Sequence, residues 1–233
     1  MAIVVLVHGT TAGGWVWRHA VAAIRRAGHE VYTPTLTGLG ERSHLLTREV
    51  GLSTHITDIA NVLRYEDLHD VILVGHSYAG AVITGVADQE RERLRQLIYL
   101  DAVVLEHGES SLATMPTALQ NEMRDRVERE GEGWKIPVMR GPNDRPASNT
   151  PHPWKSWTEP IVLANPPLAA SANIYIRCTA DKDPGAFFEQ ALEQSWQSAQ
   201  ARGWRCYEVD TVHQILADPQ PKTEILLNIV DGI

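Results

Sequence analysis

The chain has 233 residues, of which 21% are charged and 43% hydrophobic, a composition typical of a globular protein with one large domain or two small ones. Its formal net charge of -8 argues against nucleic acid or an anionic membrane surface as a main partner. No basic leader precedes the first apolar run, and no run approaches the roughly 18 apolar residues of a membrane span. We therefore expect a cytoplasmic protein. Cys178 and Cys206 lie in no CxxC or Cys/His cluster, so neither a metal nor another cofactor is indicated.

Short β-branched runs alternate with helical patterns along most of the chain. The expected strands are residues 3–7, 29–34, 71–74, 94–102, 172–180 and 204–209, and the expected helices are 15–27, 52–63, 80–90, 185–201 and 222–230. Ser53 or Thr54 is the expected cap of the second helix. Because strands that alternate with helices form parallel sheets, we predict an α/β fold with a mostly parallel six-stranded sheet flanked by helices.

The alternation of strands and helices breaks between Val103 and Ala172. We predict a core made of residues 1–103 and 172–233, with residues 104–171 inserted as a cap over the carboxyl edge of the sheet. The insertion carries three tryptophans and the run MPTAL, Met115 to Leu119. These residues predict either an apolar or aromatic substrate pocket or ordinary packing between cap and core. The tryptophans are Trp134, Trp154 and Trp157.

The stretch VILVGHSYAGAVI, Val71 to Ile83, joins a strand to a helix through Gly75 to Tyr78 alone. Such an abrupt junction strains the middle residue, Ser77, and turns its side chain outward. Small residues are needed around the serine because the helix and the strand approach closely, and Ala79 and Gly80 meet this need. The pattern is typical of a nucleophilic serine; the alternative is a serine that merely caps a helix.

A serine nucleophile needs a base, and three histidines follow Ser77 in the chain. His213 lies between the last strand and the last helix, which places it at the carboxyl edge of the sheet. His107 comes early in the insertion, and His152 lies in its proline-rich part. We predict that His213 is the base, since its loop is the one that the sheet brings to the serine.

The base needs an orienting carboxylate, which should also follow a strand. Asp181 comes directly after the strand at 172–180 and is the favoured candidate. Asp101 ends the strand at 94–102 and is also allowed, and Asp183 is a third possibility. The residues alone leave these three open.

Two backbone amides are expected to bind the oxyanion. The amide of Tyr78 begins a helix, and the amide of Thr10 follows His8 and Gly9 in the glycine-rich run HGTTAGG. His8 is expected to brace this loop. The alternative role of the loop, a phosphate cradle, would require a GxGxxG or GxxxxGK[ST] spacing that is absent from the sequence.

The sequence resembles the α/β-hydrolase superfamily, and within it the small branch of plant methyl esterases, hydroxynitrile lyases and bacterial esterases. The stretches that carry the resemblance are LVHGTTAGGWVW, TLTGLGERSHL, VGHSYAGAVI, LIYLDAVVLEHGES, YIRCTADKD and DTVHQILADP. Carried over by position, the resemblance implies Ser77 as nucleophile, Asp181 as acid and His213 as base. It implies the amides of Thr10 and Tyr78 as the oxyanion hole.

The resemblance implies a cofactor-free carboxylesterase that cleaves a small, apolar or aromatic ester through an acyl-enzyme. Lyase members carry a threonine and a lysine where this sequence has Gly9 and Gln214, which disfavours cyanohydrin cleavage. The alternatives are lyase, lactonase or amidase chemistry on the same fold, or a small-molecule receptor. The expected partner is a small ester, and a homodimer is allowed.

Overall fold

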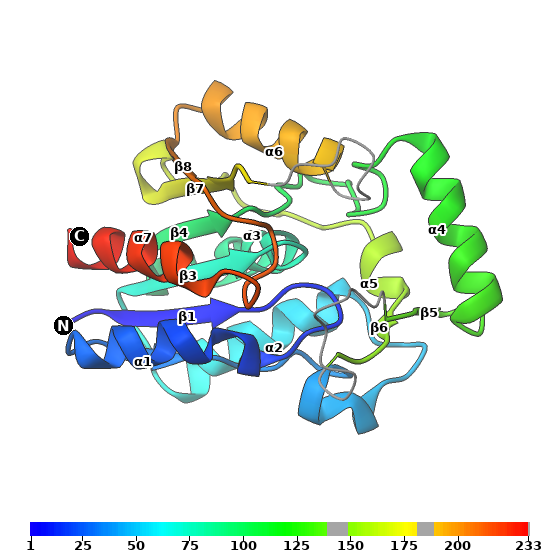
Figure 1. Cartoon of the computed structure of the whole chain (residues 1–233), viewed down its shortest axis with the longest axis horizontal. Helices are drawn as coiled ribbons and strands as arrows, with labels where there is room; N and C mark the ends of the chain where they lie inside the picture. The colour runs from blue at the N-terminus through cyan, green and yellow to red at the C-terminus, as the bar shows by residue number, and fades with distance from the viewer. Residues whose placement is uncertain (139–148, 181–188, 233) are drawn as a thin grey trace.

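The computed structural model describes residues 1–138, 149–180 and 189–232, and these residues contain a parallel six-stranded sheet (Figure 1). The strand order is β2-β1-β3-β4-β7-β8, and every pair of neighbours in it is parallel. The strands are β1 (Ile3–Val7), β2 (Glu30–Tyr32), β3 (Val71–His76), β4 (Leu94–Leu100), β7 (Asn173–Cys178) and β8 (Arg205–Val209). Each lies within a range expected from the sequence or extends it by two residues, so the predicted sheet is confirmed.

Helices cover both faces of the sheet, because successive strand side chains point to opposite sides. The helices are α1 (Arg18–Arg26), α2 (Leu52–Tyr65), α3 (Ala79–Gln89), α6 (Glu189–Ala201) and α7 (Pro219–Asp231), with short 3-10 turns at η1 (Gly14–Trp17), η2 (Gly40–Leu45), η3 (Arg91–Arg93) and η4 (Ala170–Ala172). Val4 and Leu6 pack in one apolar cluster with α1 and α7, whereas Val5 and Val7 pack in another with α2, α3 and α6.

One expected helix cap is wrong. The residue that precedes α2 is Gly51 rather than Ser53 or Thr54. The Thr54 hydroxyl instead accepts the Gly51 amide at 3.3 Å, so it stabilises the helix from the first turn. Across the described ranges, no helix is long and apolar enough to cross a membrane.

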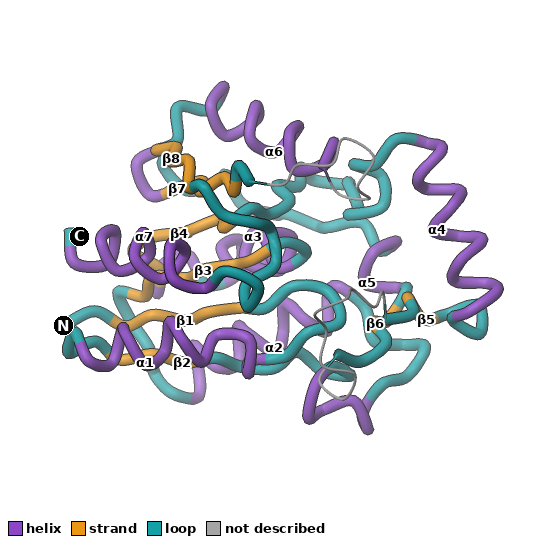
Figure 2. Tube along the Cα trace, in the orientation of Figure 1, coloured by secondary structure: helices purple, strands orange, loops and turns teal. Residues whose placement is uncertain are grey.

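Residues 104–171, called the insertion below, contribute no strand to the six-stranded sheet in the part that the structure describes. They contain α4 (Thr117–Glu130), α5 (Lys155–Thr158) and a two-stranded pair, β5 (Lys135–Ile136) and β6 (His152–Pro153). Figure 1 shows these elements beyond the end of the sheet to which the β1 arrow points, opposite both chain termini. Figure 2 shows that loops make up much of the insertion. The carboxyl ends of the strands therefore face α4, α5 and the β5–β6 pair.

Candidate active site

The turn between β3 and α3 is tightly constrained around Ser77. Ser77 has a φ of 57°, a left-handed conformation that side chains other than glycine rarely adopt. A Cβ on Gly75 would lie 2.7 Å from the Ala79 carbonyl oxygen, and one on Gly80 would lie 2.0 Å from that of Val103. The two glycines are therefore required by close packing, and the packing holds Ser77 in its strained geometry.

His213 lies within hydrogen-bonding distance of both Ser77 and a carboxylate. Its Nε2 is 3.1 Å from Ser77 Oγ, and its Nδ1 is 2.7 Å from Asp101 Oδ2. A carboxylate only accepts, so Nδ1 carries the proton and Nε2 is left to accept the serine hydroxyl. Ser77 and Asp101 are buried, whereas His213 keeps 23% of its side chain exposed. The arrangement matches a nucleophile, a base and an orienting acid.

Asp101 is fixed between two strands. It has a φ of 44°, its amide donates to the Ile176 carbonyl at 2.7 Å, and its Oδ1 accepts the Cys178 amide at 3.2 Å. The residue favoured from the sequence, Asp181, and its neighbour Asp183 lie outside the described residues. Within the described residues, the carboxylate that accepts from Nδ1 of His213 is that of Asp101.

The loop that carries His213 is held from two directions. His76 Nε2 donates to the His213 carbonyl at 2.9 Å, and the two rings lie against each other at a tilt of 36°, with centroids 4.6 Å apart. Behind the loop, the buried ammonium of Lys222 donates to Thr211 Oγ1 at 2.8 Å and to the Asp218 carbonyl at 2.7 Å. These contacts fix the backbone on both sides of the base.

His8 braces the loop after β1, as expected from the sequence. Its Nδ1 donates to the Gly9 carbonyl at 2.9 Å, and its Nε2 accepts the Leu36 amide at 3.1 Å. Burial lowers the pKa of His8 to about 4, so the ring is neutral near neutral pH. A Cβ on Gly9 would lie 2.9 Å from Ser77 Cβ, which shows how closely this loop approaches the serine. Thr10, whose amide is a predicted oxyanion donor, follows directly.

Tyr78, the second predicted oxyanion residue, is anchored by its side chain. Its hydroxyl donates to His55 Nδ1 at 2.9 Å, and His55 Nε2 donates to the Thr37 carbonyl at 3.0 Å. Burial raises the pKa of Tyr78 above its usual range and lowers that of His55 to about 4. Tyr78 immediately precedes α3, where a backbone N–H and the helix dipole both favour negative charge.

The other histidines and the tryptophans of the insertion have structural contacts. His107 Nδ1 accepts the Leu163 amide at 3.1 Å, and His152 is fully buried. Trp157 is part of the apolar core, and the Trp134 ring is covered by the cations of Arg48 and Lys135. Trp134 and Trp157 are therefore engaged in packing, and these two residues do not support the prediction of a substrate pocket.

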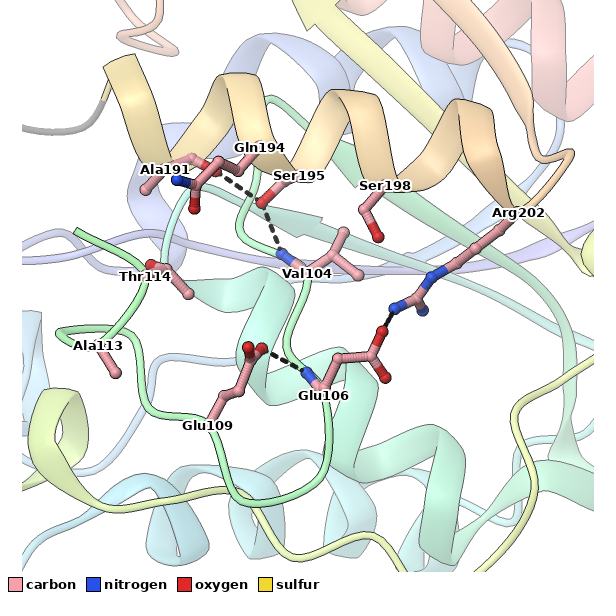
Figure 3. Close-up of a pocket in the computed structure, with 10 residues that line it drawn as sticks. All are labelled: Val104, Glu106, Glu109, Ala113, Thr114, Ala191, Gln194, Ser195, Ser198 and Arg202. Carbon is pink, nitrogen blue, oxygen red and sulfur yellow. Dashed lines mark hydrogen bonds and ion pairs between the residues drawn. The ribbon is translucent and has the colours of Figure 1, made fainter. Parts of the chain in front are cut away.

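A cavity of about 180 Å³ lies between α6 and the segment that follows β4 (Figure 3). Its polar groups bind one another: Val104 N donates to Ser195 Oγ at 3.0 Å, and Glu106 pairs with Arg202. Neither Ser77, Asp101 nor His213 lines it. Over the described part of the chain, no three His, Cys, Asp or Glu side chains gather closely enough to hold a metal ion.

The sequence matches the model of the alpha/beta hydrolase family over residues 4–218, and the chain belongs to this family. The carbendazim hydrolyzing esterase of Nocardioides sp. (strain SG-4G) is 55% identical over 123 residues, 53% of this chain and 51% of that protein. Putative methylesterase 11 of Arabidopsis thaliana is 30% identical over 109 residues, 46% of this chain and 28% of that protein. The matches thus span about half of the first relative's length, and less of the second.

Among solved structures, an extracellular alpha/beta-hydrolase from a Paenibacillus species superposes with a TM-score of 0.79. It is 20% identical, and the match covers 98% of each chain. At this identity the likeness concerns the fold alone, and it covers nearly the whole chain.

Several residues around the site have no obvious sequence signal. His76 occupies a variable position, the one before Ser77, in the strand–serine–helix pattern. Lys222 has the pattern of an ordinary residue in the first turn of a helix. His55 lies on the apolar face of α2, where the helical period could have marked it as buried. Their partners lie in other elements or loops, which spacing alone does not identify.

Proposed function

We propose that this chain is a serine esterase that works through an acyl-enzyme. The observation that carries the proposal is the continuous set of contacts from Ser77 Oγ to His213 Nε2, and from His213 Nδ1 to Asp101 Oδ2. Binding alone does not require a strained serine, a base and a buried carboxylate in one line. The family assignment supports the same conclusion.

In the first half of the reaction, Ser77 Oγ attacks the ester carbonyl while His213 Nε2 takes the hydroxyl proton. Asp101 keeps the imidazole in the required tautomer and stabilises the imidazolium. The amides of Thr10 and Tyr78 donate to the oxyanion, and one such donor is typically worth about 3 kcal/mol in the transition state. The tetrahedral intermediate collapses as Nε2 returns the proton to the leaving alcohol.

In the second half, His213 takes a proton from water, and the resulting hydroxide attacks the acyl group on Ser77. Collapse of this intermediate releases the carboxylic acid and restores the serine hydroxyl. Every proton in the cycle moves through Nε2, so the mechanism needs no cofactor.

The orienting acid in this proposal is Asp101, whereas the family resemblance implies Asp181. The support for Asp101 is its 2.7 Å contact with Nδ1 and its burial. Asparagine substitutions at the two positions separate these assignments, because only the orienting acid fixes the tautomer of the base.

The proposed substrate is a small ester with an apolar or aromatic group. The support comes from the relatives, which are named for carbendazim and for methyl esters. Carbendazim, methyl benzoate and p-nitrophenyl butyrate are therefore suitable probes. A preference for long-chain or charged esters would contradict this substrate class.

The insertion, residues 104–171, is proposed to act as a cap over the site, since its elements α4, α5, β5 and β6 lie beyond the carboxyl ends of the strands. A cytoplasmic location and a homodimer remain predictions from the sequence. Lyase chemistry is disfavoured at Gly9, because any side chain there would meet Ser77.

The proposal is tested by pre-steady-state hydrolysis of p-nitrophenyl acetate with the wild type and Ser77→Ala. We expect a burst of nitrophenolate followed by steady turnover, both absent from the variant. A burst without turnover would point to a receptor or a non-hydrolytic enzyme. An equal rate in Ser77→Ala would show that Ser77 is not the nucleophile.

A further inference from the structure

Thr11, the residue after the proposed oxyanion donor Thr10, has an unusual backbone conformation. Its φ is 61°, in the left-handed region that β-branched residues strongly disfavour. A residue keeps such a conformation only when its surroundings impose it. The Thr11 N–H belongs to the peptide that also contains the Thr10 carbonyl, so a contact at Thr11 restrains the backbone of Thr10, whose own N–H is the proposed donor, from its carboxyl side.

The insertion binds both backbone polar groups of Thr11. The Thr150 amide donates to the Thr11 carbonyl at 2.9 Å, and the Thr11 amide donates to His152 Nδ1 at 3.4 Å. The Thr150 hydroxyl also accepts the Gly40 amide at 3.0 Å. Gly40 in turn touches Gly13, because a Cβ on either glycine would lie 3.3 Å from the Cα of the other. The insertion thus joins two glycine-containing loops, one with Thr11 and Gly13 and the other with Gly40. They are called the glycine loops below.

His152 is held in the orientation that this contact requires. Ser156 donates its hydroxyl proton to the Pro153 carbonyl at 2.9 Å, so His152 Nε2 must donate to Ser156 Oγ, which lies 2.8 Å away. This leaves Nδ1 as an acceptor for Thr11. Burial keeps the pKa of His152 well below its usual range, which preserves the neutral ring. The ring also packs edge-on against Tyr78, with centroids 4.8 Å apart.

We propose that His152 and Thr150 are positioning residues for the oxyanion hole. This inference rests on the proposed function, since the oxyanion is that of the ester. Both nitrogens of His152 are engaged, so it is not a second base. Its contacts instead lie next to both predicted oxyanion donors. The Thr11 amide, which donates to Nδ1, adjoins Thr10, and the ring of Tyr78 lies against the histidine ring. The insertion is in this view part of the catalytic geometry as well as a cover.

The test compares His152→Leu with His152→Asn. Asparagine and leucine are similar in size, but only asparagine offers an acceptor near the position of Nδ1. Thr150→Val and Thr150→Ser form a second matched pair, in which only serine keeps the hydroxyl that Gly40 binds. Lys155→Ala is the control, because it breaks a contact between the insertion and Glu49 (3.1 Å) without touching the glycine loops.

For each variant, kcat and KM for p-nitrophenyl acetate are measured together with the hydrogen-exchange rate of the Thr11 amide. A lost oxyanion donor costs about 10²–10³ in kcat, so a displaced one should cost His152→Leu about tenfold. KM should stay within about twofold, since these donors act in the transition state. The Thr11 amide should exchange faster, and His152→Asn should restore both values towards those of the wild type.

Wild-type kcat and Thr11 exchange in His152→Leu would overturn the proposal. So would an equal loss in His152→Asn and His152→Leu, because the ring packing rather than the acceptor would then matter. If His152→Leu does not fold, the Thr150 pair decides, with valine expected to lower kcat and serine to keep it. If the wild type forms no acyl-enzyme, the proposed function is wrong. The hydrogen-exchange rate of the Thr11 amide then decides by itself whether the insertion restrains the loop after β1.

Discussion

The two sides of the catalytic edge are built differently. On the nucleophile side, formed by the loops after β1 and β3, backbone segments approach so closely that there is no room for a side chain at Gly75 or Gly80. On the acid–base side, formed by the ends of β4 and β7 and the loop after β8, single hydrogen bonds join Asp101 to Cys178 and to His213, which are 77 and 112 residues away in the chain. Steric constraints are local and leave a spacing pattern in the sequence, whereas long-range hydrogen bonds do not.

The largest expected effect lies on the acid–base side. Asp101→Asn should lower kcat by about 10³-fold or more, because the amide no longer favours the required tautomer of His213. Asp181→Asn is the matched control and should change kcat less than about threefold. Steady-state hydrolysis of p-nitrophenyl butyrate measures both. The opposite ranking would assign the orienting role to Asp181.

On the nucleophile side, the largest expected effect is on stability. A Cβ at Gly80 would lie 2.0 Å from the Val103 carbonyl oxygen, so Gly80→Ala must displace the backbone that holds Ser77. We expect the free energy of unfolding to fall by about 3 kcal/mol. Glu122→Ala, on the exposed face of α4, should stay within about 0.5 kcal/mol. Denaturant unfolding provides the comparison, and an unchanged midpoint for Gly80→Ala would contradict the steric account.

Acid should weaken the nucleophile side through its buried histidines. The pKa values of His8 and His55 are lowered to about 4 in the folded chain, while the unfolded value is 6.5. Their contribution is therefore complete above pH 6.5 and is lost as the pH falls towards 4, where the unfolded chain binds more protons. Between pH 6 and 5, each histidine should lower the free energy of unfolding by about 1 kcal/mol.

Urea unfolding at half-unit steps of pH measures this slope. The variant His55→Gln should reduce the slope by the share of one histidine, because glutamine does not titrate. A pH-independent stability between pH 6 and 4 would contradict the burial of neutral rings.

A smaller effect is expected from the lysine behind the base. Lys222→Met removes two hydrogen bonds but also removes a buried amine, whose pKa is lowered by that burial. The two effects partly cancel, and we expect a loss of about 1 kcal/mol in the free energy of unfolding. The stability should be measured with kcat, which should fall a few-fold as the His213 loop loosens. A more stable variant with wild-type kcat would show that Lys222 does not support the base.

The difference between the two sides explains which parts of the site could be predicted. The strand–serine–helix spacing was sufficient to predict the tight turn at Ser77, and the strand order was sufficient to predict that His213 lies beside it. The acid was harder, because Asp101 and Asp181 both follow strands at the same edge. The hydrogen bond to His213, the burial of the carboxylate and its anchoring by the Cys178 amide favour Asp101.

The insertion was the least predictable part, since several of its contacts with the core join residues more than a hundred positions apart. His152 illustrates this, because its position in a proline-rich stretch gives no sign that it would bind the Thr11 amide. The sequence likewise left open whether the tryptophans of the insertion line a pocket or pack against the core. Whether Trp157 lines a cavity or fills the core depends on neighbours that its own segment does not contain.

The central claim is that Ser77 carries the acyl group during turnover. Rapid acid quench of the wild type with p-nitrophenyl acetate, followed by peptide mass analysis, locates the acetyl group directly. The account predicts an acetylated Ser77 in the first turnover and none in His213→Ala at the same time. An unmodified Ser77 during hydrolysis, or an acetyl group on another side chain, would contradict it.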